Sequence, residues 1–360
     1  MFDPDKPFND LPLLPPKQNL ETINVLRKAV NANRALAELK GLGDTIPNQS
    51  MLINSLTLLE AKDSSEIENI ITTHDELFRA FSIQSKNIDP SLKEVLNYRE
   101  ALWTGYRLIR EKGIITTNII YEIQELLLNN TAGIRTLSGT VLKNDRTGKI
   151  IYTPPEGEQV IREKLANMEQ YINSDLDGLD PLIKMAVIHY QFEAIHPYYD
   201  GNGRTGRILN VLYLIYSKLL NLPVLYLSSY IIKHKGKYYK SLIEVTSKKA
   251  WENWILFMLE AVEHTSLDTI DRIKNIRSLL ERTAEKVKSG LPKIYSKELI
   301  EIIFQQPYCR ISHIVGAGIV ARRAASDYLR QLEKIGILES RKSGRDSLFI
   351  NTELCSLLRK

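Results

Sequence analysis

A twelve-residue segment, 196–207, concentrates the residue types that phosphate chemistry requires. It reads His-Pro-Tyr-Tyr-Asp-Gly-Asn-Gly-Arg-Thr-Gly-Arg and opens into an apolar helical pattern over 203–220. Gly201 and Gly203 flank Asn202, so successive backbone N–H groups can converge there, and the start of the helix adds its positive end. The segment therefore predicts an anion nest able to hold phosphates.

The charged and titratable residues of the same segment predict how a phosphate would be bound there and which group would act as a base. Arg204 and Arg207 are three residues apart, so both guanidiniums can lie on one side of the helix and bind phosphate oxygens. Asp200 offers a hard oxygen ligand suited to Mg²⁺ beside phosphates. His196 titrates near neutral pH and can take a proton from an attacking hydroxyl. A lone histidine before proline is usually structural, but this order and spacing together favour a phosphate-transfer site.

The elements that position this segment are predicted to be mainly α-helical. Apolar residues recur at helical spacing along most of the chain, with glycine or proline at several of the boundaries. The pattern predicts helices over 20–39, 49–61, 74–82, 91–112, 117–129, 157–173, 180–192, 203–220, 237–249, 251–264 and 266–288.

One segment departs from the helical pattern. Residues 140–144 and 149–153 are short and β-branched, and they flank Asp-Arg-Thr-Gly at 145–148, which is typical of a β-hairpin turn with glycine in the left-handed position. Pro154 and Pro155 then stop strand pairing. Two interpretations stay open: the hairpin is a small structural flap, or it is an edge offered to a partner chain.

A break at 289–292, Ser-Gly-Leu-Pro, marks a predicted domain boundary. Beyond it, helices at 296–305, 311–315 and 320–335 precede strands at 337–340 and 347–351, which is the order of a winged helix. Residues 289–360 hold twelve Lys/Arg and seven Asp/Glu, an excess equal to the whole-chain charge of +5. The module is expected to contact DNA, or alternatively to serve in protein–protein contact or as a homodimer interface.

Length and composition place the chain among soluble globular proteins of two or three domains. The first residues are acidic and rich in proline, unlike a signal peptide, and no apolar stretch is long enough for a bilayer, so we expect no membrane partner. Cys309 and Cys355 have no metal-ligand spacing and predict a reduced, cytoplasmic setting without a disulfide framework.

The segment 196–207 resembles the signature of the Fic family, His-Pro-Phe-x-Asp/Glu-Gly-Asn-Gly-Arg-x-x-Arg, and departs from it only at Tyr198, whose hydroxyl would need a partner. The resemblance implies a Fic-type helical core with a β-hairpin flap. It also implies a protein adenylyltransferase that uses ATP and Mg²⁺ and transfers AMP to a Ser, Thr or Tyr hydroxyl of a target protein or of itself, releasing pyrophosphate.

The resemblance assigns roles to single residues. His196 would be the base and Asp200 the metal ligand, while Arg207 would hold the γ-phosphate. Gly203 favours nucleotidyl transfer, since a relative that phosphorylates its target has lysine there. The remaining members of the phosphate cradle would be Gly201, Asn202, Arg204, Thr205 and Gly206.

Two further segments resemble parts of the same family. The hairpin at 140–153 resembles the flap that aligns the target protein by strand addition, with Tyr152 near the nucleotide, although its first strand lacks the arginine that many relatives have. Tyr238 and Tyr239, followed by Leu242, resemble the aromatic pair near the adenine; the alternative is an ordinary half-buried helix face.

Residues 64–69, Ser-Ser-Glu-Ile-Glu-Asn, resemble the inhibitory helix of the family. Ser64 and Glu68 are four residues apart and would share a helix face, with Asn69 closing the motif. The resemblance implies that Glu68 pairs with Arg207 and takes the place of the γ-phosphate. The predicted domains are 1–90 with this motif, a catalytic core at 91–288 and a winged helix at 289–360. Removal of AMP by the same site, and a DNA-binding regulator with a nucleotide-sensing core, remain alternatives.

Overall fold

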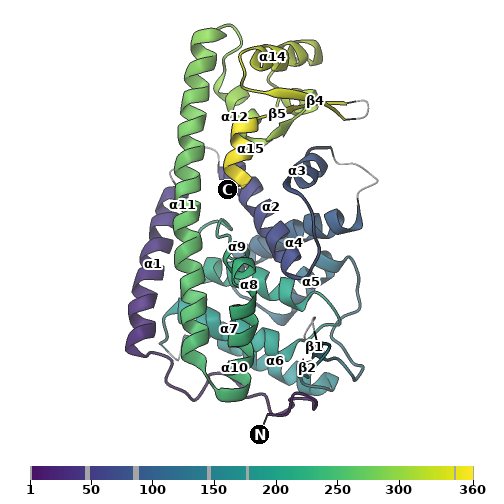
Figure 1. Cartoon of the computed structure of the whole chain (residues 1–360), viewed down its shortest axis with the longest axis vertical. Coiled ribbons are helices and arrows are strands. Elements are labelled where there is room, and N and C mark those ends of the chain that lie inside the picture. Colours follow the sequence, from purple (N-terminus) through teal and green to yellow (C-terminus); the bar gives the residue numbers. More distant parts are fainter. Residues whose placement is uncertain are drawn as a thin grey trace.

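The computed structural model of the chain describes residues 2–44, 49–83, 89–143, 147–175, 178–343 and 346–359. Helices make up most of the regular structure, as the apolar periodicity predicts (Figure 1). The helices before the C-terminal domain are α1 (Ile23–Asp44), α2 (Gln49–Ile67), α3 (His74–Ile83), α4 (Pro90–Lys112), α5 (Thr117–Leu128), α6 (Glu158–Ile172), α7 (Pro181–Ile195), α8 (Asn202–Tyr216), α9 (Ser228–Lys233), α10 (Lys235–Lys248) and α11 (Trp251–Gly290).

Helix α7 lies in the core, and its side chains are buried around almost its whole circumference. Its start is fixed by Asp180, whose carboxylate accepts a hydrogen bond from Leu182 N–H at 2.8 Å, and by Pro181 in the first helical position. The indole of Trp254 in α11 donates to the Ala186 carbonyl of α7 at 2.8 Å. The end of α7 at Ile195 therefore lies at a fixed place in the core.

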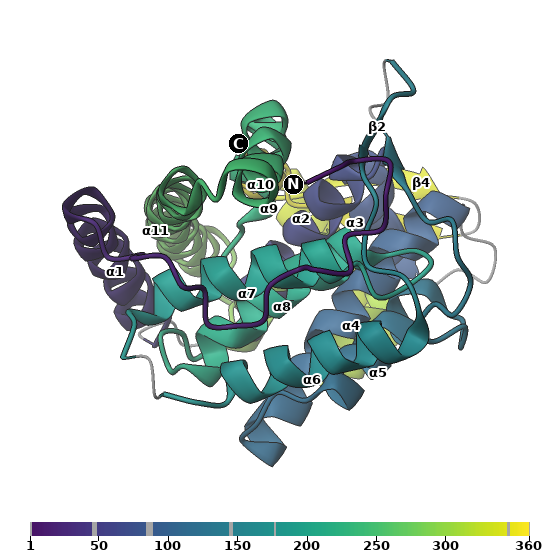
Figure 2. The ribbon, with the colours of Figure 1, turned by 90° about the horizontal axis from the view of Figure 1, so that it is seen from below.

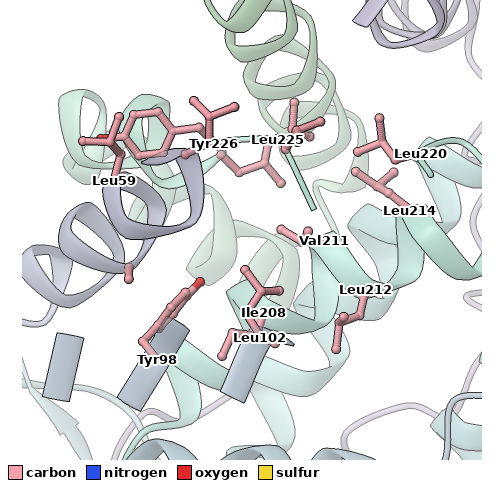
Figure 3. Close-up of a cluster of buried hydrophobic side chains, with 14 of the residues drawn as sticks. Leu59, Tyr98, Leu102, Ile208, Val211, Leu212, Leu214, Leu220, Leu225 and Tyr226 are labelled. Atoms are coloured by element: carbon pink, nitrogen blue, oxygen red, sulfur yellow. The ribbon is translucent and has the colours of Figure 1, made fainter. Parts of the chain in front are cut away.

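Helix α8 packs on α7 and also faces α2 and α4. Figure 3 shows part of the surrounding core: Tyr98 and Leu102 from α4 lie near Ile208 of α8, and Leu59 from α2 lies beside Tyr226, all of them buried. Burial of each such side chain contributes about 1.5–3 kcal/mol. The two helices that flank the segment 196–207 are thus both held by the core, which fixes the loop between them.

Helix α11 corrects one expectation. Two helices were expected at 251–264 and 266–288, but a single helix of 40 residues runs from Trp251 to Gly290 and packs beside α1 (Figure 1). The stretch around Thr265 does not end the helix, since its hydroxyl bonds to the Ala261 carbonyl one turn back at 2.7 Å. Neither glycine nor proline interrupts residues 251–289.

The hairpin is shorter than expected. Strand β1 (Leu142–Lys143) pairs antiparallel with β2 (Ile150–Tyr152), in the register Leu142↔Tyr152. Gly148 has the left-handed backbone that the turn was expected to need, with φ of 66°. Of the other expected turn residues, 145 and 146 lie outside the described residues and Thr147 lies within them.

The C-terminal elements are α12 (Lys297–Gln305), β3 (Tyr308–Cys309), α13 (Ile311–Gly316), α14 (Arg322–Lys334), β4 (Glu339–Ser343), β5 (Asp346–Ile350) and α15 (Thr352–Arg359). Their sheet has the order β3-β5-β4, with both pairings antiparallel. The turn before α14 uses Gly318, with φ of 70°, whereas Gly316, also expected there, is the last residue of α13. Strand β3 and helix α15 were not anticipated.

The C-terminal domain packs on the N-terminal helices rather than standing apart. Helix α12 and α15 contact α2, and the backbone of β3 lies against α3. Both cysteines, Cys309 and Cys355, are free and buried in this domain. Within the described part of the chain, none of the helices has both the length and the apolar character that a bilayer span requires.

Candidate active site

The predicted anion nest forms at the start of α8. Gly201 adopts a left-handed backbone, with φ of 76°, immediately before the helix, and no side chain caps the helix start. The Asn202 amide closes the preceding loop: its Oδ1 accepts from Tyr198 N–H at 2.9 Å and its Nδ2 donates to the Tyr198 carbonyl at 2.8 Å. The first N–H groups of a helix have no partner inside it, so this start can bind an anion.

Gly203 is surrounded closely in the first turn of α8. A Cβ atom at Gly203 would collide with Glu68 Oε1 and would lie 3.1 Å from an Arg207 guanidinium nitrogen. The absence of a side chain therefore lets the Glu68 carboxylate approach the helix start. Thr205 is buried behind this turn, and Gly206 faces Phe192 of α7 across a similarly narrow gap.

Arg207 is fully buried and makes three hydrogen bonds to the end of α2 and the turn that follows it. Its guanidinium donates to Ser64 Oγ at 2.8 Å, to the Ser64 carbonyl at 2.9 Å and to Glu68 Oε1 at 2.8 Å. Helix α2 ends at Ile67, and Asn69 turns the chain with a left-handed backbone, φ of 64°. The structure thus brings Ser64 and Glu68 together on Arg207, as the resemblance implied.

The Glu68–Arg207 pair carries charge on both sides. Burial alone would raise the pKa of Glu68, but Arg207 outweighs it and holds that pKa below the ordinary value. Burial alone would lower the pKa of Arg207, and Glu68 instead raises it. Both groups are charged at neutral pH, so removing one leaves the other without its main partner.

Arg204 contacts carboxylates different from the one that Arg207 contacts. It donates to Glu94 of α4 at 2.6 Å and lies 3.8 Å from Asp200. The Asp200 side chain is 74% exposed and accepts from Gly201 N–H at 2.6 Å. Among the described residues, no group of three acidic, histidine or cysteine side chains could hold a metal. A single exposed carboxylate beside an anion nest fits Mg²⁺ bound mainly through phosphates.

His196 ends α7 with a left-handed backbone, φ of 49°, and its N–H donates to the Phe192 carbonyl at 3.0 Å. Burial, and then the charge of Arg135, lower the pKa of its imidazole to about 4. The ring is therefore uncharged at neutral pH and able to accept a proton. This is the protonation state that a general base needs.

Arg135 was not anticipated from the sequence. Its guanidinium donates to the His196 carbonyl at 2.7 Å and to the Ile195 carbonyl at 3.2 Å, and it also bonds to the Pro155 carbonyl. The Arg135 N–H donates to the Pro197 carbonyl at 2.9 Å. One buried side chain thus ties the end of α7 to the segment after the hairpin.

The two tyrosines that were expected near a nucleotide have different surroundings. Tyr152 lines an apolar pocket between the hairpin and α10, and its hydroxyl donates to the Ala194 carbonyl at 2.7 Å. Tyr238 is buried, does not line this pocket, and bonds to His189 at 2.8 Å. It is Tyr239, together with Leu242, that lines the pocket.

Tyr198, the single departure from the family signature, is buried between Tyr121 and Phe192, with ring centroids at 6.5 and 6.3 Å. Its hydroxyl has no hydrogen-bond partner among the described residues. Burial raises the pKa of this hydroxyl far above its usual range, so it stays neutral. The extra oxygen is accommodated by the loop without a polar contact of its own.

A second carboxyl is buried near Arg207, on the face of α2 that contacts this arginine. Glu60 accepts from Ser228 N–H at 3.0 Å, from Ser228 Oγ at 2.6 Å and from Tyr98 OH at 3.2 Å. Burial raises the pKa of Glu60 to about 7 despite these donors. Glu60 and Ser64 are four residues apart on α2, and Glu68 follows by four more just past its end, so these three polar side chains face the core on one side.

Glu60 predicts a pH-dependent contribution to stability. The folded protein binds more protons at Glu60 between pH 4.5 and 7, so this side chain stabilises the fold below pH 4.5 and that stability is lost as pH rises toward 7. We expect the unfolding free energy of the wild type, relative to Glu60→Gln, to fall across this window. Urea unfolding of both proteins at several pH values measures the difference. A difference that does not change with pH would contradict the assignment.

Two partners of the site could not have been found from a sequence motif. Arg135 and Glu94 reach the segment 196–207 from distant parts of the chain, and neither lies in a pattern of its own. Glu60 could have been found, because it stands four residues before Ser64 on the predicted helix.

Comparison with known proteins adds independent findings. Models of the Fic/DOC family N-terminal region, of the Fic/DOC family, and of the C-terminal domain of SoFic-like protein adenylyltransferases match residues 26–107, 114–214 and 279–354. A protein adenylyltransferase of Aquifex aeolicus, described as probable, is 27% identical over 71% of this chain and 75% of its own length.

Two further proteins are similar to the chain, one in sequence and one in structure. Protein adenylyltransferase fic-1 of Caenorhabditis briggsae is 35% identical, but over 25% of this chain and 17% of its own length. The chain thus spans under a fifth of that relative. The crystal structure of a Fic family protein from Desulfovibrio desulfuricans superposes with a TM-score of 0.60, covers 93% of this chain and 98% of its own, and is 18% identical, which shows a shared fold.

Proposed function

Because the chain belongs to the Fic/DOC family, we propose that it is a protein adenylyltransferase whose resting state is inhibited by Glu68. The observation that carries the proposal is the uncapped start of α8, with two buried arginines on its first turns and an uncharged His196 just before it. A nest, cationic side chains and a base in this order suit transfer of a phosphorus group to a hydroxyl.

The reaction would be an in-line displacement at the α-phosphate of ATP. The oxygen of a target hydroxyl forms a bond to the α-phosphorus, the bond from that phosphorus to the bridging oxygen breaks, and pyrophosphate leaves. His196 takes the hydroxyl proton at its imidazole nitrogen, since its ring is uncharged. The N–H groups at the start of α8 and Arg204 would stabilise the phosphate charge. Mg²⁺, held by Asp200 and the phosphates, would supply further charge neutralisation.

The nucleobase would occupy the apolar pocket between the hairpin and α10. Tyr152 and Tyr239 present aromatic rings to this pocket, and Leu142 and Leu242 complete its apolar lining. Flat apolar bases favour such a site because it removes both surfaces from water. The pocket adjoins Ala194, so its floor is the last turn of α7, which leads to His196.

Inhibition follows from competition for Arg207. The guanidinium has its hydrogen bonds to Ser64 and Glu68 in the resting chain. A γ-phosphate needs the same donors, and its negative charge would lie beside the Glu68 carboxylate. ATP could bind with a fully engaged triphosphate only when Glu68 leaves, so the resting enzyme is proposed to be mostly inactive.

The position of the label on ATP tests the type of reaction. Glu68→Gly protein is incubated with ATP labelled either on the α-phosphate or on the γ-phosphate. We expect the α label on the protein, on itself or on a lysate target, and the γ label in released pyrophosphate. The γ label on protein would show phosphorylation instead, and neither label on protein, with ATP bound, would reject group transfer.

The labelled protein also tests a second candidate function, the removal of AMP. Glu68 lies against the first turn of α8, where its carboxylate could orient a water molecule toward a phosphodiester. In that reaction water attacks the phosphorus and the protein hydroxyl leaves as AMP is freed. Purified AMP-modified protein would then lose its label faster with wild type than with Glu68→Gly, which is the reverse of the order for AMP addition.

Other expectations about partners stay predictions. Docking of a target protein along the hairpin, DNA contact through residues 289–360 and homodimer formation are proposals that rest on sequence. The basic residues expected to contact DNA include Arg322 and Arg323 at the start of α14 and Arg341 and Lys342 of β4, which are all exposed.

A further inference from the structure

The N-terminal segment, residues 2–14, is bound along the same face of the core as the hairpin. Figure 2 shows it crossing beside α7, passing β2 and ending next to α10. We refer to these residues as the N-terminal strap. From its path we infer that Phe2 is a nucleotide-binding residue that forms one wall of the nucleobase pocket and strengthens the binding of the base. This inference rests on the proposed function.

Hydrogen bonds hold the strap in place along its length. Phe8 N–H donates to the Thr153 carbonyl at 3.0 Å, and the Thr153 hydroxyl donates to the Pro4 carbonyl at 2.6 Å. The Asn9 side chain accepts from Glu156 N–H at 2.8 Å. These bonds begin at the residue after β2, so the strap is attached to the hairpin that covers the pocket.

Further along, the strap is attached to the core helices. Lys164 of α6 donates to the Leu11 carbonyl at 2.8 Å, and Gln191 of α7 donates to the Pro12 carbonyl at 2.9 Å. Leu11 and Leu14 are buried. A segment with buried apolar side chains and bonded carbonyls is part of the fold, and its first residues are positioned accordingly.

The Phe2 ring reaches the pocket itself. It lines the same cavity as Tyr152, Tyr239 and Leu242. Phe2 stacks on Tyr152 with ring centroids 6.0 Å apart and an interplanar angle of 25°, and Phe8 packs edge-on against Phe2 at 5.6 Å. Tyr152 is fixed in turn by its bond to Ala194. Phe2 therefore has a supported orientation and a surface toward the pocket.

The chemistry of this wall favours a base over the rest of a nucleotide. An aromatic ring gains contact with the flat face or edge of a base, and such contacts change affinity by about 5- to 150-fold on truncation to alanine. The phenyl ring has neither a charge nor a hydrogen-bond donor for phosphates, which the start of α8 would bind. Phe2 should thus affect the affinity for ATP and leave the affinity for a triphosphate without a base unchanged.

The test measures binding directly and does not depend on transfer. Calorimetry gives the Kd of ATP and of inorganic tripolyphosphate, each with Mg²⁺, for Glu68→Gly protein and for the same protein with Phe2→Ala. We expect Phe2→Ala to weaken ATP binding about tenfold and to leave tripolyphosphate binding unchanged. Phe2→Tyr, which keeps the ring, should restore ATP binding.

The outcomes separate this inference from the proposed function. If ATP binds with the same affinity with and without the Phe2 ring, the inference about Phe2 is wrong, but the proposed function is unaffected. Equal weakening of both ligands shows that Phe2 acts only by supporting the hairpin, and also overturns it. If Glu68→Gly protein with Phe2 intact binds ATP no more tightly than tripolyphosphate, the base contributes no affinity. The pocket is then not a nucleobase site, and the inference about Phe2 is also wrong. Failure to transfer AMP while ATP binding depends on Phe2 rejects only the proposed reaction.

Discussion

Replacing Glu68 with glycine should increase the rate of AMP incorporation by about 5- to 150-fold, the range of typical coupling energies between two ligands of one site. The variant removes the carboxylate that occupies Arg207 at 2.8 Å and leaves the guanidinium free to bind a γ-phosphate. The measurement is the initial rate of label transfer from α-labelled ATP at a fixed ATP concentration. The Kd of ATP, measured in parallel, should fall.

Glu66 provides a matched control for this prediction. Its side chain is 35% exposed, close to the 34% of Glu68, and it lies two residues away at the end of the same helix. Glu66 pairs with Lys62 at 2.6 Å and makes no recorded contact with Arg207. Glu66→Gly thus removes a carboxylate and adds a glycine without freeing the arginine. If both variants label protein at the wild-type rate while binding ATP, autoinhibition by Glu68 is wrong.

Replacing His196 with alanine should abolish most of the transfer activity in the Glu68→Gly background, by about 10²- to 10⁴-fold. The imidazole is uncharged at neutral pH because burial and Arg135 lower its pKa to about 4, so it is available as a base. The imidazole Nδ1 is buried and has no hydrogen-bond partner among the described residues, and the proposed phosphate contacts come from other residues. The affinity for ATP, measured by calorimetry, should therefore change little while the rate falls.

The control for that prediction is His264→Ala. His264 lies on α11, is exposed and stacks on Tyr230 with ring centroids 5.4 Å apart. It is another histidine whose loss should leave the rate unchanged. A His196→Ala protein that is folded, binds ATP and still transfers AMP at the rate of its parent would exclude this imidazole as the base.

The sequence predicts the site best where the contacts are local. The turn at Gly201, the helix start and the spacing of Arg204 and Arg207 are all contained in twelve residues, so local rules describe them. The pairing of Glu68 with Arg207 joins α2 to α8 and spans 139 residues. It was anticipated only through resemblance to a family, since nothing in the local sequence specifies a partner so distant.

The contacts that escaped prediction are those between elements. Arg135 donates to backbone carbonyl groups at the end of α7. Because every residue has such a carbonyl, the sequence of side chains does not indicate which one an arginine will bind. The continuity of α11 was missed because Thr265 and Ser266 resemble a helix boundary, although the Thr265 hydroxyl bonds to the Ala261 carbonyl within the helix. Helix α15 was missed because eight residues are too few for periodicity to be decisive.

Gly203 restricts which substitutions could abolish the proposed inhibition by Glu68 and keep the enzyme active. Its missing side chain leaves room for the Glu68 carboxylate, and the same space lies at the helix start that would receive phosphate. A larger residue there would displace the Glu68 carboxylate and, under the proposed function, would also obstruct the phosphates. If Glu68 inhibits the enzyme as proposed, constitutively active variants should arise through changes at Ser64 or Glu68 rather than within the segment 196–207.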